Sequence, residues 1–281
     1  MNAFWIILTG ILVATTAGWL GCFLVLRKMS MVGDAISHAV LPGIAIAFII
    51  SGSTANIPML IGAASIGLFA TFFIETLNKK GRLQSDASIG IVFTLLFAIG
   101  VVIINVFATN VHIDQECVLY GEIAYVPLDT WIAGGGQNLG PRAIWILGAV
   151  FLIVLFTIII GYKGLFITTF DPDYAKAIGI STTFWHYLLM GLVSLTTVVA
   201  FESVGAILVV AFIIVPAATA YLLTNNLKIM LIFSAIVGII ASIGGYYFAV
   251  VLNASIAGAM TVVLGLLFAV VFIRFRIRRQ I

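Results

Sequence analysis

The segment that decides the fold is residues 27–43, Arg27 to Gly43, which reads RKMSMVGDAISHAVLPG. Two cations open it, and the apolar run that follows continues to Ile50. Asp34 and His38 are four residues apart in this run, so on a helix both side chains share one face. A carboxylate and an imidazole on one face are able to hold a divalent cation. Ionisable groups are costly in a membrane segment and indicate a functional site there. The structural alternatives are a helix cap for Asp34 and a buried, carbonyl-bonded histidine for His38.

The composition defines the class of protein. Of 281 residues, 63% are hydrophobic and only 8% are charged, and apolar runs of membrane-spanning length recur from end to end. We expect an all-α polytopic membrane protein, with residues 1–281 forming a single transmembrane permease domain. Nucleic-acid binding is disfavoured because the cations lie in short loops beside the spans. The chain has no G-x-x-x-x-G-K-[ST] pattern, so it is not itself an ATPase, and no H-E-x-x-H or paired-aspartate arrangement favours an intramembrane enzyme.

Nine spans are predicted, and their charges orient them. They cover about 4–26, 32–50, 57–77, 87–107, 143–162, 183–200, 206–223, 229–252 and 255–273. If alternate loops are assigned to alternate sides, twelve of the 13 Lys and Arg residues fall on one side, and Arg142 alone falls on the other. The positive-inside rule then places the C-terminus in the cytoplasm and the N-terminus outside. Pro42 and Pro216 are expected to kink their spans, and residues 201–205 to form a break.

The longest polar stretch, residues 108–141, is predicted to be an extracellular loop. It is expected either to concentrate cations and dock a partner or to be a simple solvated loop. A short surface helix is expected around 118–124. Cys117 lies here and Cys22 lies late in the first span, on opposite sides of the membrane, so they are not expected to form a disulfide. The candidate docking residues of this loop are His112, Asp114, Glu116, Glu122 and Asp129.

A second polar insert, residues 169–180, is predicted to be a small cytoplasmic helix. Asp171 is a suitable cap, Pro172 suits the first helical position, and Gly179 is a stop signal. A short helix capped at both ends favours a surface that is presented to another protein. The candidate contact residues are Asp171, Pro172, Asp173, Tyr174, Ala175, Lys176 and Gly179.

Two further ionisable residues are interpreted as structural. Glu75 is four residues before Lys79, which predicts an ordinary helical ion pair. His186 is expected in the first turn of its span, at the membrane interface.

Asp34 and His38 supply only two ligands, whereas a protein-bound divalent metal takes four to six. The pair therefore predicts half of a site that a twofold dimer completes with two Asp and two His. Oxygen and nitrogen ligands suit manganese, zinc or ferrous iron and disfavour copper(I). Metal binds the neutral imidazole, so acidification is expected to weaken the site.

Three ordered blocks resemble the bacterial ABC permeases for manganese and zinc, the ABC-3 family: residues 27–43, 170–179 and 204–220. The resemblance covers nearly the whole chain, and residues 111–123 are more similar to the manganese-type branch. It implies a homodimeric permease in the bacterial plasma membrane, with two ABC ATPase subunits on the cytoplasmic side and an extracellular metal-binding lipoprotein. It also implies the cobalamin-importer-like, type II ABC importer fold, here without its first helix, and makes the 169–180 helix the coupling helix.

The resemblance places Asp34 and His38 in the metal pathway, with Glu202 either a further ligand near the outer mouth or a loop carboxylate in contact with water. Manganese(II) is the expected cargo, and no permanently bound cofactor is expected. The alternatives are import of zinc(II) or iron(II) by the same kind of permease and, outside the family, an ATP-independent secondary metal transporter.

Overall fold

The computed structural model describes residues 2–51, 56–81, 83–107, 123–132 and 138–280. Within these ranges, nine helical segments are long and apolar enough to cross a membrane, as predicted. The long helices are α1 (Asn2–Leu26), α4 (Asn56–Gly81), α5 (Ser85–Phe107), α7 (Arg142–Phe170), α9 (Thr182–Val204), α10 (Ala206–Leu223), α11 (Leu227–Leu252) and α12 (Ile256–Gln280). The remaining elements are α2 (Val32–Ala39), α3 (Leu41–Ser51), the 3-10 helix η1 (Ile123–Leu128), β1 (Thr130–Ile132), β2 (Asn138–Pro141) and α8 (Pro172–Ala177).

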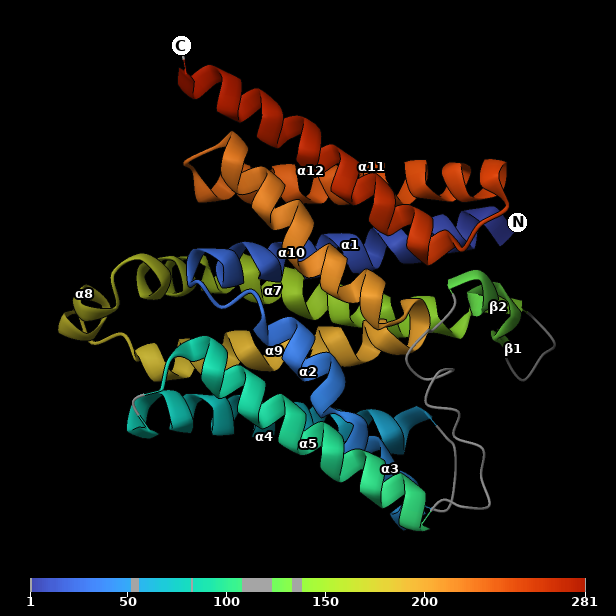
Figure 1. Ribbon diagram of the computed structural model, residues 1–281, viewed down its shortest axis with the longest axis horizontal. Coiled ribbons are helices and arrows are strands. Elements are labelled where there is room, and N and C mark those ends of the chain that lie inside the picture. Colours follow the sequence, from blue (N-terminus) through green and yellow to red (C-terminus); the bar gives the residue numbers. More distant parts are fainter. Residues whose placement is uncertain (1, 52–55, 82, 108–122, 133–137, 281) are drawn as a thin grey trace.

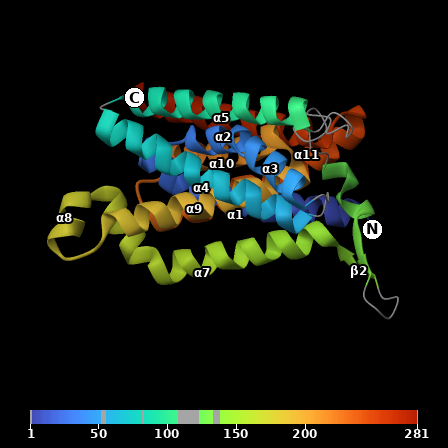
Figure 2. The same cartoon turned by 90° about the horizontal axis from the view of Figure 1, so that it is seen from below.

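The helices form an elongated bundle whose two ends differ (Figure 1). The short helix α8 lies at one end, and the antiparallel β1–β2 pair lies at the other. The N-terminus lies at the β1–β2 end and the C-terminal end of α12 at the α8 end, and Figure 2 shows the same separation after a quarter turn. Termini at opposite ends are what an odd number of crossings requires.

Helix α1 is the centre of the bundle because α7, α9, α10 and α11 all pack against it. It is rich in small and hydroxyl residues, which allow neighbouring helices to approach closely where lipid supplies no hydrophobic driving force. A Cβ atom at Gly21 would overlap the backbone carbonyl of Ile213 on α10. Thr9, Thr15 and Thr16 are buried and donate their hydroxyls to carbonyls one turn earlier, so no polar group of theirs is left unsatisfied. Cys22 is a buried free thiol.

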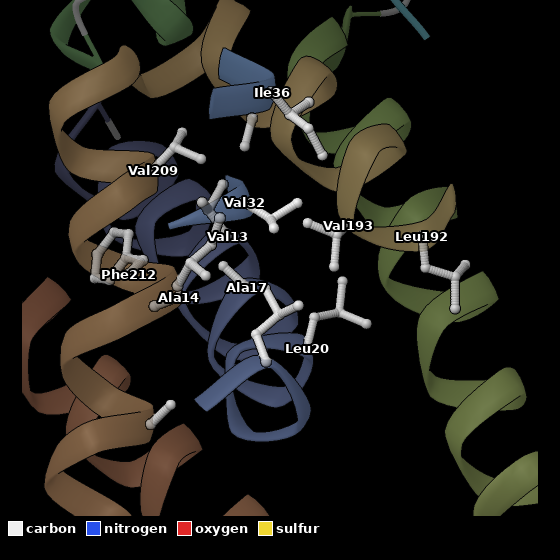
Figure 3. Packing of buried hydrophobic residues seen from close by; sticks show 14 of the residues in the cluster. Val13, Ala14, Ala17, Leu20, Val32, Ile36, Leu192, Val193, Val209 and Phe212 are labelled. Carbon is white, nitrogen blue, oxygen red and sulfur yellow. The ribbon is translucent and has the colours of Figure 1, made fainter. Parts of the chain in front are cut away.

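Figure 3 shows how this core is assembled from apolar side chains of four helices. Apolar side chains of α1, α2, α9 and α10 belong to one buried cluster. The labelled residues are Val13, Ala14, Ala17 and Leu20 of α1, Val32 and Ile36 of α2, Leu192 and Val193 of α9, and Val209 and Phe212 of α10. The core therefore holds α2 against α9 and α10, which in turn pack on the central helix α1.

The second predicted span is divided at Val40 into α2 and α3. Pro42 has no N–H to donate to the carbonyl of His38, so the helix cannot continue unbroken through this point. Pro42 also abuts Gly100 of α5, where an added Cβ would lie 2.8 Å from the proline nitrogen. The predicted kink is therefore a local break at Val40: α2 is an eight-residue helix, and the backbone hydrogen bonds from Val40 to Ile36 and from Ile44 to Val40 keep α2 and α3 in one span.

Two predicted helix ends differ from the structure, and a third prediction is mostly outside the described residues. Helix α7 continues to Phe170 instead of ending at 162, because the single cation Lys163 does not stop a helix that has no proline before Pro172. Helix α9 continues to Val204, so the predicted break at 201–205 is confined to Gly205, whose φ of 83° a regular helix cannot accommodate. The predicted helix at 118–124 lies mostly outside the described residues, and residues 123–128 form η1.

Candidate metal-binding site

Helix α2 buries one face and leaves Asp34 and His38 on the other. Its buried residues include Val32, Gly33 and Ile36, and an added Cβ at Gly33 would lie 2.8 Å from Cδ1 of Ile213. Close packing on that side turns the two ionisable side chains away from α10. Asp34 is not the helix cap, because the cap residue is Met31 and it makes no side-chain cap hydrogen bond.

Asp34 and His38 lie beside each other, as their spacing predicts. Oδ1 of Asp34 is 3.7 Å from Nε2 of His38, and the two side chains are 38% and 30% exposed. This separation exceeds a hydrogen bond. It is close to the distance of about 3.4 Å between two ligands that each lie about 2.1 Å from one tetrahedral metal ion. The pair is therefore open to one side and spaced for a shared cation.

Two aromatic rings of α5 flank the imidazole of His38. The ring of Phe93 is 5.5 Å from it and tilted by 50°, and the ring of Phe97 is 6.0 Å away and edge-on. His38 and Phe97 also line a small cavity together with Phe201 near the end of α9. Aromatic contacts of this kind restrict the imidazole's rotation, so α5 positions the candidate ligand His38 that α2 supplies.

Glu202 is separate from this pair. It lies in the last turn of α9, exposed, and the charges with which it interacts are Asp129 and Arg142. Among the residues that the structure describes, no three His, Cys, Asp or Glu side chains come together as a metal-binding group. The predicted break around Glu202 is wrong because these residues are helical.

Of the predicted docking residues in the 108–141 loop, only Asp129 is described. Its side chain is exposed, directly before β1, and its carbonyl accepts a hydrogen bond of 2.9 Å from the backbone of Arg142. His112, Asp114, Glu116 and Glu122 lie outside the described residues.

Helix α8 begins and ends at the residues that the sequence predicts. Oδ1 of Asp171 accepts a hydrogen bond of 2.9 Å from the N–H of Tyr174, Pro172 is the first helical residue, and Gly179 has a φ of 82°. Ala175 is buried and anchors the helix, whereas Tyr174 is 56% exposed. Lys176 pairs with Asp173 at 3.1 Å on the exposed side. The helix therefore presents an aromatic and charged surface beyond the end of the bundle.

The structure also shows two contacts that the sequence interpretation missed. Oε2 of Glu75 on α4 is 3.6 Å from Nε2 of His186 on α9. Arg27 donates from Nε to the hydroxyl of Thr169 at 3.0 Å and from Nη2 to that of Thr168 at 3.1 Å. The side chain of Lys79, the predicted partner of Glu75, lies outside the described part of the chain. Neither contact has a short-range spacing signal, because each joins distant segments.

A bundle of nine membrane-crossing segments, with a carboxylate–imidazole pair inside one of them and a presented helix at one end, defines a multi-pass membrane protein of the transport class. The sequence model of the ABC 3 transport family matches residues 2–275, nearly the whole chain. The chain belongs to the ABC 3 transport family.

Its relatives include transport proteins for two different metals. The chain is 50% identical to the manganese transport system membrane protein MntD of Bacillus subtilis, over 96% of this chain and 90% of the relative. It is 40% identical to the zinc transport system membrane protein TroD of Treponema pallidum, over 95% and 72%. The solved structure of PsaBC from Streptococcus pneumoniae in complex with Fab matches with a TM-score of 0.78 at 36% identity, over 95% of this chain and 90% of that one. The expected ABC importer fold is confirmed.

Proposed function

We propose that this chain is the transmembrane permease of an ATP-driven ABC importer that moves manganese(II) into the cell. The observation that carries the proposal is the Asp34–His38 pair, held 3.7 Å apart and half open on a short membrane helix. Its oxygen and nitrogen donors suit manganese, and the 50% identity with a manganese transport membrane protein favours this cargo. The chain contributes the pathway, and a separate subunit hydrolyses ATP.

The pathway site is completed by a second copy of the chain. One chain supplies two ligands, and a twofold axis beside α2 would supply two more, which gives a four-ligand site of two Asp and two His. The partial exposure of both side chains in the single chain supports this arrangement. Such a site binds transiently, because conduction requires that the ion also leave.

The two ends of the bundle contact different partners. The α8 end carries the excess of Lys and Arg and faces the cytoplasm, where two ATPase subunits bind α8. The opposite end, with β1, β2 and the acidic 108–141 loop, faces outward and receives the metal from an extracellular metal-binding lipoprotein. Glu202, near Asp129 and Arg142 at this end, is a further ligand on the way in.

Import of radioactive manganese(II) by the complex with its ATPase and binding protein in proteoliposomes tests the proposal. Asp34→Asn removes the charged oxygen ligand, so we expect at least a tenfold loss of import. Even replacing a residue that only hydrogen-bonds to a metal ligand costs about tenfold or more. Asp86→Asn, on an exposed acid at the start of α5, is the matched control and leaves import unchanged. Full import by Asp34→Asn, or import that continues without ATP, contradicts the proposal.

Zinc(II) is the second candidate cargo because the chain is also 40% identical to a zinc transport membrane protein. Raw affinity of nitrogen and oxygen ligands favours zinc over manganese. A competition assay decides: if excess manganese fails to reduce uptake of radioactive zinc while excess zinc abolishes manganese uptake, the cargo is zinc.

A further inference from the structure

A second carboxylate–imidazole pair lies far along the chain from the first. Oε2 of Glu75 is 3.6 Å from Nε2 of His186, compared with 3.7 Å between Asp34 and His38. Both histidines that the structure describes thus have a carboxylate oxygen at nearly the same distance from Nε2. This distance is too long for a hydrogen bond between the two side chains, but it suits two ligands of one ion. The inner pair is the more buried, with Glu75 10% and His186 18% exposed.

The pair lines a cavity of about 700 Å³ at the α8 end of the bundle. The cavity extends from Val32, the first residue of α2, to Pro172 and Lys176 of α8. Val32, at the wall of this cavity, is two residues before Asp34, so the start of α2 connects the cavity to the outer pair.

The cavity walls provide further oxygen atoms. Side chains of Thr71, Asn78, Ser85 and Thr182 line it and are able to hold the waters that complete the shell of a hard dication. Tyr187 on α9 interacts with the Glu75 carboxylate and is the neighbour placed to orient it.

The basic residues of the cavity limit how tightly it binds. Three cations line the cavity. Arg27 is hydrogen-bonded to Thr168 and Thr169, and Lys176 is paired with Asp173. Lys28 is the third. Nearby positive charge shortens the stay of a dication, and a weak site is what release requires.

We propose that Glu75 and His186 form an inner binding site that receives the transported dication on its way to the cytoplasm. This inference rests on the proposed function, since it needs a metal to arrive from the Asp34–His38 site. It differs from a purely structural interpretation, in which Glu75 and protonated His186 form an ion pair that fastens α4 to α9.

Two substitutions at one position separate these interpretations. His186→Lys keeps a cation opposite Glu75 but replaces the imidazole by an ammonium group, which has no lone pair for a metal. His186→Asp removes the cation but supplies a second oxygen ligand of the kind manganese accepts. An ion pair tolerates the lysine and is broken by the aspartate, whereas a metal site has the opposite preference.

The experiment measures the initial rate of manganese(II) import by the reconstituted complex carrying each variant. We expect His186→Asp to keep most of the import and His186→Lys to lose it by about tenfold, the lower range of losses at metal-site positions. The reverse order overturns the inner site. Wild-type complex that imports no manganese contradicts the proposed function instead, so the two failures are distinguishable.

If both variants lose import, bound manganese(II) is measured directly by electron paramagnetic resonance on the purified complex. In an Asp34→Asn background the α2 site is disabled, and we expect manganese binding that disappears when Glu75→Gln is added. Glutamine keeps a hydrogen-bonding partner for Tyr187, and equal melting temperatures show that the fold is retained. Binding that survives Glu75→Gln, or its absence from the Asp34→Asn complex, overturns the proposal.

Discussion

At the scale of single residues, the orientation of the candidate metal-binding face of α2 depends on the packing behind it. Gly33 leaves no room for a side chain between α2 and Ile213, so Asp34 and His38 lie away from this contact. The hydroxyl of Ser37 is buried and donates to the carbonyl of Gly33 at 2.9 Å, so this face carries no unmet hydrogen bond. Asp34 and His38, the proposed ligands, are thus oriented by neighbours outside the candidate site.

The ring of Phe97 gives a test of this orientation. Phe97→Ala removes one of the two rings beside His38, and the imidazole gains rotational freedom. An aromatic contact is worth about 0.5–1.5 kcal/mol, so we expect the apparent KM for manganese to rise about two- to tenfold. Phe107→Ala, at the exposed end of the same helix, is the control and leaves the KM unchanged. Equal values for both variants would show that the ring does not position His38.

At this scale, a contact can be predicted from the sequence when its two residues are close together along the chain. Asp34 and His38 are one helical turn apart, so their proximity could be predicted from spacing alone. Glu75 and His186 lie on different helices, and only the packing of α4 on α9 brings them together. Spacing along one helix predicts only the pair of Glu75 with Lys79, whose side chain lies outside the described part of the chain.

At the scale of elements, the close contact of α1 with α10 sets the spacing of the core. Gly21→Ala would push a methyl group into the carbonyl of Ile213, and a backbone atom cannot move aside as a side-chain end does. Overpacking of this kind costs about 1–3 kcal/mol. We expect a lower melting temperature in detergent, whereas Gly148→Ala, which meets nothing within 4 Å, leaves it unchanged. An unchanged melting temperature for Gly21→Ala would indicate that the helices separate freely.

Arg27 connects two elements, the turn after α1 and the end of α7. Thr168 and Thr169 donate their own hydroxyl protons to the carbonyls of Gly164 and Leu165, which leaves their lone pairs to accept from the guanidinium. Burial lowers the pKa of Arg27 to about 10, so it remains charged at neutral pH. Helix α8, the proposed coupling helix, begins only three residues after Thr169, so this contact joins it to the α1–α2 turn.

We expect Arg27→Ala to uncouple transport from ATP hydrolysis. Without the guanidinium, movement of α8 reaches α2 less efficiently, so the manganese imported per ATP hydrolysed falls several-fold while ATPase activity persists. Hydrogen bonds to a charged group are worth about 1.5–3 kcal/mol, which is enough for this effect. Both quantities are measured on the same proteoliposomes, with Lys163→Ala, an exposed cation of α7, as the control. A ratio unchanged by Arg27→Ala contradicts the coupling role.

Element boundaries were the weaker part of the sequence prediction. Nine spans and the capped helix followed from apolar run length and from Asp171, Pro172 and Gly179. The ends of α7 and α9 did not, because a charged residue such as Lys163 marks where the bilayer ends and not where the helix ends. Helix α7 ends two residues before Pro172, and helix α9 ends directly before Gly205, which has a positive φ.

At the scale of the whole molecule, the charge asymmetry gives a testable orientation. A cysteine-free background carries single replacements in two exposed loops, Asn225→Cys between α10 and α11 and Ala254→Cys between α11 and α12. Position 254 is expected to react with a membrane-impermeant thiol reagent on intact cells, and position 225 only after permeabilisation, since positive loops stay inside. The opposite labelling pattern would invert the orientation and with it the assignment of α8 to the cytoplasm.

The length of α7 has a mechanical consequence. Its 29 residues extend about 43 Å at about 1.5 Å per residue, whereas the hydrocarbon layer is about 30 Å thick. The helix therefore acts as a lever arm: tilting it by about 5° about its midpoint displaces either tip by roughly 2 Å over a half-length of about 21 Å. Because Arg27 is hydrogen-bonded near the α8 end of α7, such a tilt would move the turn from which α2 starts by nearly the full displacement of that tip.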